Sequence, residues 1–230
     1  MKTNNIFMSG EWKDLIMSTY EIDKSIIEPY LPKNTEIDFY KNKALLSMIA
    51  FTFSKVKFFG IRVPFHQYFG QINFRFYVKS KIDGAKGVVF VKEFAPKPFI
   101  ACIANWLYNE PYHYKKIRFK KIIDNNQIKL NYSFRGSKID IESKLQTSQL
   151  INNTFEHFVV DRYIAFIKNH IGKTFQYKIY HKPWEVYNLK SINIDKTILN
   201  LLPKEFKNLK HISTCYVKGS SIEVQKGILQ

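Results

Sequence analysis

The stretch Gly70-Gln71-Ile72-Asn73-Phe74-Arg75-Phe76-Tyr77-Val78-Lys79 alternates apolar and polar side chains along its whole length. Successive side chains of a β-strand point to opposite faces, so this stretch is predicted to be a strand with one apolar and one polar face. The polar face carries Gln71, Asn73, Arg75 and Tyr77. Two interpretations of it follow: the polar face is solvated, or it lines an interior pocket.

The same period of two recurs through most of the chain, which indicates antiparallel strands. We expect strands at 12–20, 43–56, 70–79, 86–94, 113–123, 127–135, 138–145, 174–182, 211–217 and 220–225. Hairpin turns are predicted at Asp124-Asn125-Asn126 and at Gly136-Ser137, because Asn and Gly tolerate positive φ. The fold class expected is mostly β (α+β), an antiparallel meander that closes toward a β-barrel.

Four helices are expected to cover this barrel. They span 23–31 with Asp23 as N-cap, 98–108, 154–170 between Thr154 and Gly172, and 195–202. No repeat, linker or shift in composition divides the chain, so residues 1–230 are predicted to form one domain.

The composition is strongly basic, with 36 Lys and Arg against 19 Asp and Glu and a formal charge of +17. Arginine is present only at Arg62, Arg75, Arg118, Arg135 and Arg162. Phosphate recognition favours clustered arginine, so a solvated lysine-rich surface is the preferred interpretation over a dedicated polyanion site. Nucleic-acid binding is therefore expected to be weak and nonspecific.

Cysteine usage and segment lengths point to a cytoplasmic protein. Cys102 and Cys215 are too few for a disulfide framework, and residues 1–12 lack the features of a signal peptide. No apolar run reaches the ~18 residues of a membrane helix, so no membrane span is expected. Histidines with metal-ligand spacing and glycine-rich phosphate loops are both missing from the sequence, so neither a metal nor another cofactor is predicted.

Several short segments, in order and spacing, carry a resemblance to a known family. They are Trp12, Leu31-Pro32, Glu36-Ile37-Asp38, Asn73-x-Arg75-x-Tyr77-Val78, Pro111-Tyr112, Asp161-Arg162-Tyr163 and His181-x-Pro183-Trp184. Over roughly residues 11–225 the chain resembles the YqjF-like family (domain of unknown function 2071), a branch of the acetoacetate decarboxylase-like superfamily. The resemblance implies a β-barrel of that type with a few covering helices.

The resemblance also implies that decarboxylase chemistry is lost. In the related decarboxylases a glutamate occupies the position of Gln71, and a Pro-Lys-Lys segment supplies the Schiff-base lysine. Here Tyr112 and His113 follow the proline. Lys115 would point to the opposite face of a regular strand, and Lys116 would lie ~13 Å further along it, so both are interpreted as a solvated strand end.

Three function hypotheses remain open at this point. The leading one is a barrel that binds a small anionic or carbonyl-containing metabolite through Gln71, Asn73 and Arg75, with Tyr112 or His113 as proton donor and no Schiff base. Regular alternation would let only one of Tyr112 and His113 face the interior. The alternatives are a polyanion-binding module built on strand 113–121, and a structural or partner-binding protein with a filled barrel. The oligomeric state is left open.

Overall fold

The computed structural model describes residues 5–62, 68–96, 112–169 and 171–230, and it is mostly β, as predicted. Its first strands are β1 (Ile6–Glu21), β2 (Thr35–Ile37), β3 (Leu45–Phe58), β4 (Ile61–Arg62), β5 (Tyr68–Ser80), β6 (Lys86–Ala95), β7 (Tyr112–Tyr114) and β8 (Arg118–Asp124). The later strands are β9 (Gln127–Phe134), β10 (Ser137–Gln149), β11 (Ile164–Lys168), β12 (Thr174–His181), β13 (Glu185–Ile194), β14 (Lys210–Gln225) and β15 (Ile228–Leu229). The helices are α1 (Lys24–Ile27), α3 (Phe155–Val160) and two 3₁₀ segments, η1 (Glu28–Tyr30) and η3 (Lys196–Leu201).

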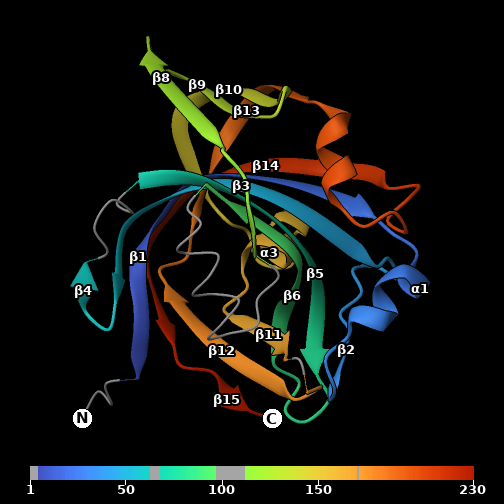
Figure 1. Cartoon of the computed structure of the whole chain (residues 1–230). Coiled ribbons are helices and arrows are strands. Elements are labelled where there is room, and N and C mark those ends of the chain that lie inside the picture. The colour runs from blue at the N-terminus through green and yellow to red at the C-terminus, as the bar shows by residue number, and fades with distance from the viewer. Residues whose placement is uncertain (1–4, 63–67, 97–111, 170) are drawn as a thin grey trace.

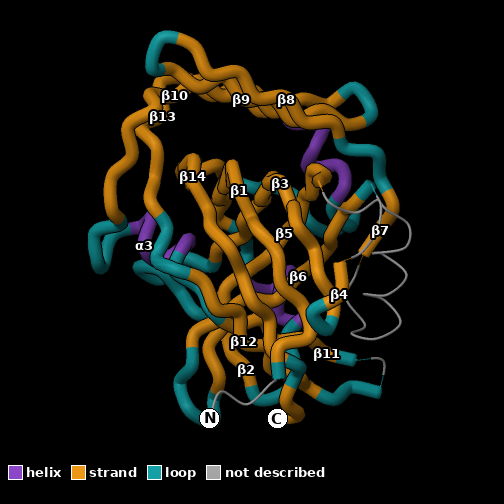
Figure 2. The backbone as a smooth tube through the Cα atoms, turned by 90° about the vertical axis from the view of Figure 1, so that its left-hand side faces the viewer, coloured by secondary structure: helices purple, strands orange, loops and turns teal. Residues whose placement is uncertain are grey.

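Seven strands pair in a closed circuit. Hydrogen bonding runs from β12 through β11, β6, β5, β3 and β1 to β14, and β12 pairs β14 again through three residue pairs that begin at Ile179 and Val224. The order then continues from β14 through β13, β10 and β9 to β8. These last four strands form a second layer across one side of the circuit (Figures 1 and 2).

Strand β5 lies between two hydrophobic cores. Its apolar face, which includes Phe74 and Phe76, packs against inward-facing residues of β9 and β10 together with α1 and η3. Its other face contributes Phe69 and Tyr77 to a core inside the circuit, where α3 also packs (Figure 1). A hairpin layer therefore covers the apolar face of β5, in addition to the helices expected there.

A left-handed residue in β1 ties the second layer to the circuit. Asp14 has a φ of 57° and lies where the register of β1 against β3 shifts. Its carboxylate accepts hydrogen bonds from Lys121 of β8 (2.6 Å) and from the Tyr216 hydroxyl (2.5 Å), and its carbonyl accepts one from Tyr132 (2.9 Å). The bend in β1 thus gives one buried acid partners on three other strands.

The predicted helix at 154–170 is wrong. Thr154 caps a helix as expected, but α3 ends at Val160 and the chain continues as strand β11. Apolar residues at this spacing suit either structure, and pairing with β12 together with the hydrogen bond from Arg162 Nε to the Phe158 carbonyl (2.8 Å) favours the break. Gly172 (φ 77°) lies in a turn between strands instead of capping a helix.

The other element predictions have mixed outcomes. The helix at 23–31 is present as α1 and η1 with Asp23 as its N-cap, and 195–202 is a 3₁₀ segment. The single strand predicted at 113–123 is two strands, β7 and β8, while 211–217 and 220–225 join into one, β14. Strands β11 and β13 were not predicted. The helix at 98–108 lies outside the described residues.

Both hairpin turns are present. Asn125 and Asn126 have positive φ values of 43° and 61°, as that turn requires. The second turn lies one residue earlier than predicted, at Arg135-Gly136, because Phe134 pairs with Ser137. Within the described ranges no helix has the length and apolar character needed to cross a bilayer.

Replacing Gly219 by alanine is expected to lower the free energy of unfolding by about 3 kcal/mol or more. Gly219 has a φ of 75°, and a Cβ there would lie 2.0 Å from the Trp12 carbonyl oxygen. The matched control is Gly84→Ala, where φ is 70° and nothing lies within 4 Å, so only the backbone strain of about 1 kcal/mol applies. Urea denaturation of both variants measures the difference, and equal losses would contradict this packing of β14 on β1.

Candidate functional site

A cavity of about 80 Å³ lies inside the strand circuit. Its described lining residues include a polar group, Gln71, Asn73, Arg75, Glu93 and Arg162, and an aromatic group, Phe7, Trp12, Phe51, Phe53, Phe58, Phe90, Tyr177 and Trp184. The volume exceeds the ~10–15 Å³ that one water needs, so the cavity has room for a small ligand. An apolar pocket with a few convergent polar groups is the usual form of such a site.

Strand β5 places the three predicted ligand-binding residues in this cavity. Gln71, Asn73 and Arg75 are 2%, 6% and 8% exposed, and all three line it. Their shared direction follows from the period-two alternation of β5. The polar face therefore lines the interior, and the solvated interpretation of this face is wrong.

Arg75 is a buried cation with no acidic partner among the described residues. Its Nη2 donates to the carbonyl of Val159 in α3 (2.8 Å), while its Nε is buried and has no hydrogen-bond partner among the described residues. The described part of the chain also supplies it no carboxylate within ion-pair distance. Burial lowers the pKa of Arg75 from its ordinary value, since removing water disfavours the charged form.

The second buried guanidinium, that of Arg162, has a carboxylate partner. Arg162 Nη1 lies 2.7 Å from the Asp38 carboxylate, and the guanidinium also stacks 4.2 Å over the ring of Phe158. Both side chains of this ion pair are nearly inaccessible to solvent. Arg162 is therefore fully compensated within the protein, whereas Arg75 is left with charge and donor capacity directed at the cavity.

The sequence pattern did not identify Glu93 of β6 as a site residue. It is 3% exposed, lines the cavity, pairs across the strands with Asn73 and accepts a hydrogen bond from Gln71 Nε2 (3.3 Å). A register shift opposite Phe74 and Arg75 puts Glu93 on the same face as Phe90, although the two residues differ in parity. Strict alternation along β6 would have pointed the Glu93 side chain away from the cavity. The register shift is what points it into the cavity.

The indole groups of Trp12 and Trp184 meet at the cavity wall. Their ring centroids are 6.3 Å apart, and Trp184 Nε1 donates to the Ser220 hydroxyl (2.9 Å). Trp12 Nε1 is buried and has no hydrogen-bond partner within the described ranges. The cavity thus contains a second unused donor beside Arg75 Nε, and an unused acceptor, Asn73 Oδ1.

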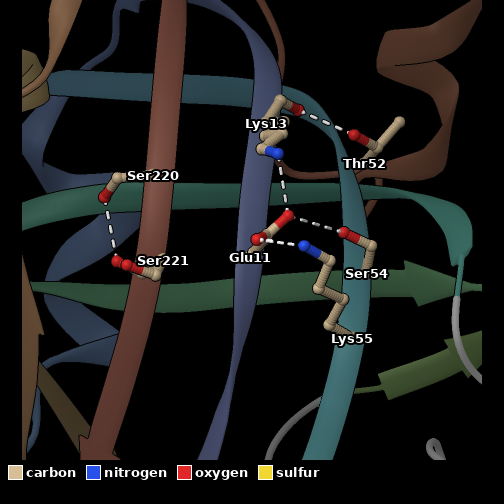
Figure 3. Close-up of polar contacts among 7 residues, drawn as sticks. All are labelled: Glu11, Lys13, Thr52, Ser54, Lys55, Ser220 and Ser221. Carbon is tan, nitrogen blue, oxygen red and sulfur yellow. Dashed lines mark hydrogen bonds and ion pairs between the residues drawn. The ribbon is translucent and has the colours of Figure 1, made fainter.

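Successive side chains of β1 point to opposite faces, so Glu11 and Lys13, the chain neighbours of Trp12, point away from the cavity. Glu11 accepts from Lys13 (2.8 Å) and from Lys55 of β3 (2.8 Å), and Ser54 of β3 donates to it at 3.5 Å (Figure 3). These hydrogen bonds lower the pKa of Glu11, so its negative charge is held between two lysines. The network joins β1 to β3 beside Trp12.

The two proposed proton donors are placed on β7. Tyr112 pairs with Glu93 and His113 with Phe94 in a parallel ladder. The His113 side chain is exposed and stacks on Phe94, whose ring belongs to the core outside the circuit. His113 therefore does not reach the cavity, which corrects its place among the site candidates; Tyr112 has the register position of Glu93. Pro111 lies outside the described residues.

In the described part of the chain, no three His, Cys, Asp or Glu side chains lie close enough together to hold a metal ion. His181, for example, is stacked between Trp184 (4.0 Å) and Tyr163 (4.4 Å), and its Nδ1 pairs with the Lys182 carbonyl (2.8 Å). Burial lowers the pKa of His181. It is a packing residue behind the indole wall.

Sequence comparisons place the chain in one family. Residues 9–218 match the family model DUF2071, described as an uncharacterized conserved protein. The chain is 22% identical over 191 residues to the uncharacterized protein YqjF of Bacillus subtilis (strain 168), a match that covers 80% of this chain and 76% of that protein.

Solved structures share the fold at low identity. The acetoacetate decarboxylase of Legionella pneumophila superposes with a TM-score of 0.62 at 12% identity, over 97% of this chain and 87% of the decarboxylase. The enduracididine biosynthesis enzyme MppR complexed with pyruvate superposes with a TM-score of 0.63 at 10% identity, over 96% and 88% of the two chains. An acetoacetate decarboxylase-like enzyme from Sphingomonas wittichii RW1 has a TM-score of 0.62 at 8% identity, over 97% and 92%.

Removal of the two buried guanidinium groups is expected to affect the free energy of unfolding differently. Arg162→Met should lower the free energy of unfolding by about 3–5 kcal/mol, because it leaves Asp38 buried and unpaired. Arg75→Met should change it by less than about 1 kcal/mol or raise it, because an uncompensated buried cation is replaced by an apolar side chain. Urea denaturation with comparison of midpoints and m-values measures both, and a loss for Arg75→Met as large as that for Arg162→Met would make Arg75 a structural brace.

Proposed function

Because this chain belongs to the DUF2071 family of uncharacterized conserved proteins, with a buried cavity in a fold of the acetoacetate decarboxylase type, we propose that it binds a small carboxylate-containing metabolite in that cavity. Arg75 binds the carboxylate, and Gln71, Asn73 and Trp12 orient the rest of the ligand. The circuit of seven strands serves as a small barrel around it, and any chemistry proceeds without a Schiff base.

The observation that carries this proposal is the state of Arg75. A buried guanidinium costs several kcal/mol unless an anion compensates it, and the described residues supply Arg75 with no such anion. A ligand carboxylate would supply the missing charge and accept from the unused Nε, in the geometry that guanidinium groups favour. The unused Asn73 Oδ1 would accept a hydrogen bond from the same ligand, and the unused Trp12 Nε1 would donate one to it.

The ligand class is narrowed by the cavity and by the neighbours of the fold. About 80 Å³ with an aromatic wall suits an acid of a few carbon atoms better than a nucleotide or a sugar phosphate. MppR, which shares the fold, is complexed with pyruvate in one structure. We therefore choose short 2-oxo acids, represented by pyruvate, as the first candidates for this chain.

A Schiff-base mechanism has no support from the described lining, which includes no lysine. Lys116 is exposed, and Lys115 follows β7 with its amide bonded to the Ala95 carbonyl (2.9 Å). An ordinary lysine with a pKa near 10.4 is almost wholly charged at neutral pH and needs a desolvated setting to act as a nucleophile. We accordingly propose that this chain lacks acetoacetate decarboxylase activity.

We treat the chain as one domain in this proposal. Strands β1, β3 and β5 each contribute side chains to both hydrophobic cores, so neither core is assembled by a separate part of the chain. Cys215 is a free, buried thiol whose pKa is raised to about 12 by burial, in keeping with the cytoplasmic location predicted from cysteine usage.

Pyruvate is expected to bind the wild-type protein, and Arg75→Met is expected to weaken binding by about 10- to 100-fold. Loss of one or two charge-assisted hydrogen bonds to a carboxylate accounts for that factor. Arg118→Met removes the same charge from an exposed position on β8 and should leave the dissociation constant unchanged. Isothermal titration calorimetry measures all three proteins. Binding that survives Arg75→Met intact would contradict the proposed site, and absence of wild-type binding to any short 2-oxo acid would contradict the proposed function.

The lysine excess is expected to give only weak, nonspecific nucleic-acid binding. Retention of the protein on short duplex DNA should disappear as salt rises from ~50 to ~200 mM, because phosphate contacts are exchanged for counterions. A gel-shift series with two unrelated sequences measures this. Binding that prefers one sequence and persists at the higher salt would instead favour the polyanion-binding alternative.

A further inference from the structure

A buried carboxylate lies beside Gln71 on the neighbouring strand β6. Glu93 lies across from Asn73 and beside Gln71, buried in the wall of the same cavity. The Cβ atoms of such a cross-strand pair are about 5 Å apart, so Glu93 lies next to Asn73 on the cavity side. No other carboxylate is among the described residues that line the cavity.

Resting on the function proposed above, we propose that Glu93 is a proton-transfer group that interconverts the keto and enolate forms of a bound 2-oxo acid. Arg75 is two residues from Asn73 on the same face of β5, about 7 Å along the strand. An acid whose carboxylate lies on Arg75 would have room for its next carbon atoms in the same cavity that Glu93 lines.

The step is balanced by proton movements alone. The Glu93 carboxylate removes a proton from the carbon next to the ketone, and the electron pair of that C–H bond moves to form the enolate. Negative charge develops on the former ketone oxygen, where a fixed N–H donor stabilises it most effectively. Among the described lining residues, Trp12 and Arg75 have unused N–H groups that can serve as such donors. Return of the proton from Glu93 to carbon restores the keto form.

Gln71 orients Glu93 in this arrangement. The side-chain amide of Gln71 donates to one carboxylate oxygen of Glu93. A base must be held within hydrogen-bond reach of the proton that it removes, and a neutral amide holds it without adding a second negative charge. A glutamate at position 71 would place two carboxylates together, so Gln71 and Glu93 form a consistent pair.

Hydrogen–deuterium exchange of pyruvate tests the proposal. Wild-type protein with pyruvate in D₂O should accelerate the loss of the methyl signal in the proton NMR spectrum beyond the rate in buffer. Glu93→Gln should reduce the protein-dependent rate by about 10²- to 10⁴-fold, the usual contribution of a general base, with pyruvate still bound within a few fold of the wild-type affinity. Glu223→Gln makes the same substitution at an exposed position on β14 and should exchange at the wild-type rate.

The outcomes separate the two proposals. Absence of pyruvate binding by the wild type removes the proposed function, while binding without exchange removes only the role of Glu93. If Glu93→Gln does not fold, Glu93→Asp, which keeps the carboxylate but shortens its reach, should fold and exchange more slowly than wild type.

Three further results would overturn the role of Glu93. They are undiminished exchange in Glu93→Gln, a pyruvate adduct on a lysine after borohydride treatment, and tight binding of alanine with loss of that binding in Glu93→Gln. The last would mark Glu93 as an ammonium-binding group.

Discussion

The site depends on one constraint: the middle of strand β5 lies between two hydrophobic cores, so its polar side chains Gln71, Asn73 and Arg75 are buried. Phe74 and Phe76 fill one core, and the alternate positions have only the interior of the strand circuit to enter. Arg75 is therefore a buried guanidinium whose Nη2 donates to the Val159 carbonyl at the end of helix α3. A protein selected for stability alone would place an apolar residue there, which is consistent with the ligand-binding role proposed for Arg75.

Helix α3 shows how the fold supplies that support. The helix stops after six residues, and the following turn lets Arg162 bond both to the Phe158 carbonyl and to Asp38, far away in sequence. The same break leaves the Val159 carbonyl accepting from Arg75 and Tyr77. A helix continued to residue 170 would bond these carbonyls internally and leave Arg75 without a partner.

The sequence predicted the direction of the β5 side chains because one strict period covered the whole strand. Alternation put Gln71, Asn73 and Arg75 on one face but left open whether that face was solvated or lined a pocket, and the family resemblance was what supported the pocket. Glu93 could not be found in this way, since its orientation depends on a bulge formed by pairing between β5 and β6. The helix predicted at 154–170 failed for a related reason: its apolar spacing suits a helix or a strand, and the tertiary partners Asp38 and β12 decide between them.

The described lining of the cavity contains no lysine, and this affects what these residues can do with a carbonyl compound. An imine delocalises electrons onto its nitrogen, whereas a free ketone must place negative charge on oxygen, which requires donors already fixed in position. The interior supplies such donors at Trp12 and Arg75, and the only acid in its described lining, Glu93, is on the adjoining strand. Deprotonation next to a ketone needs these groups alone. Decarboxylation at a similar rate would need the stronger electron sink that the described lining does not contain, so proton transfer is the chemistry that this set of residues favours.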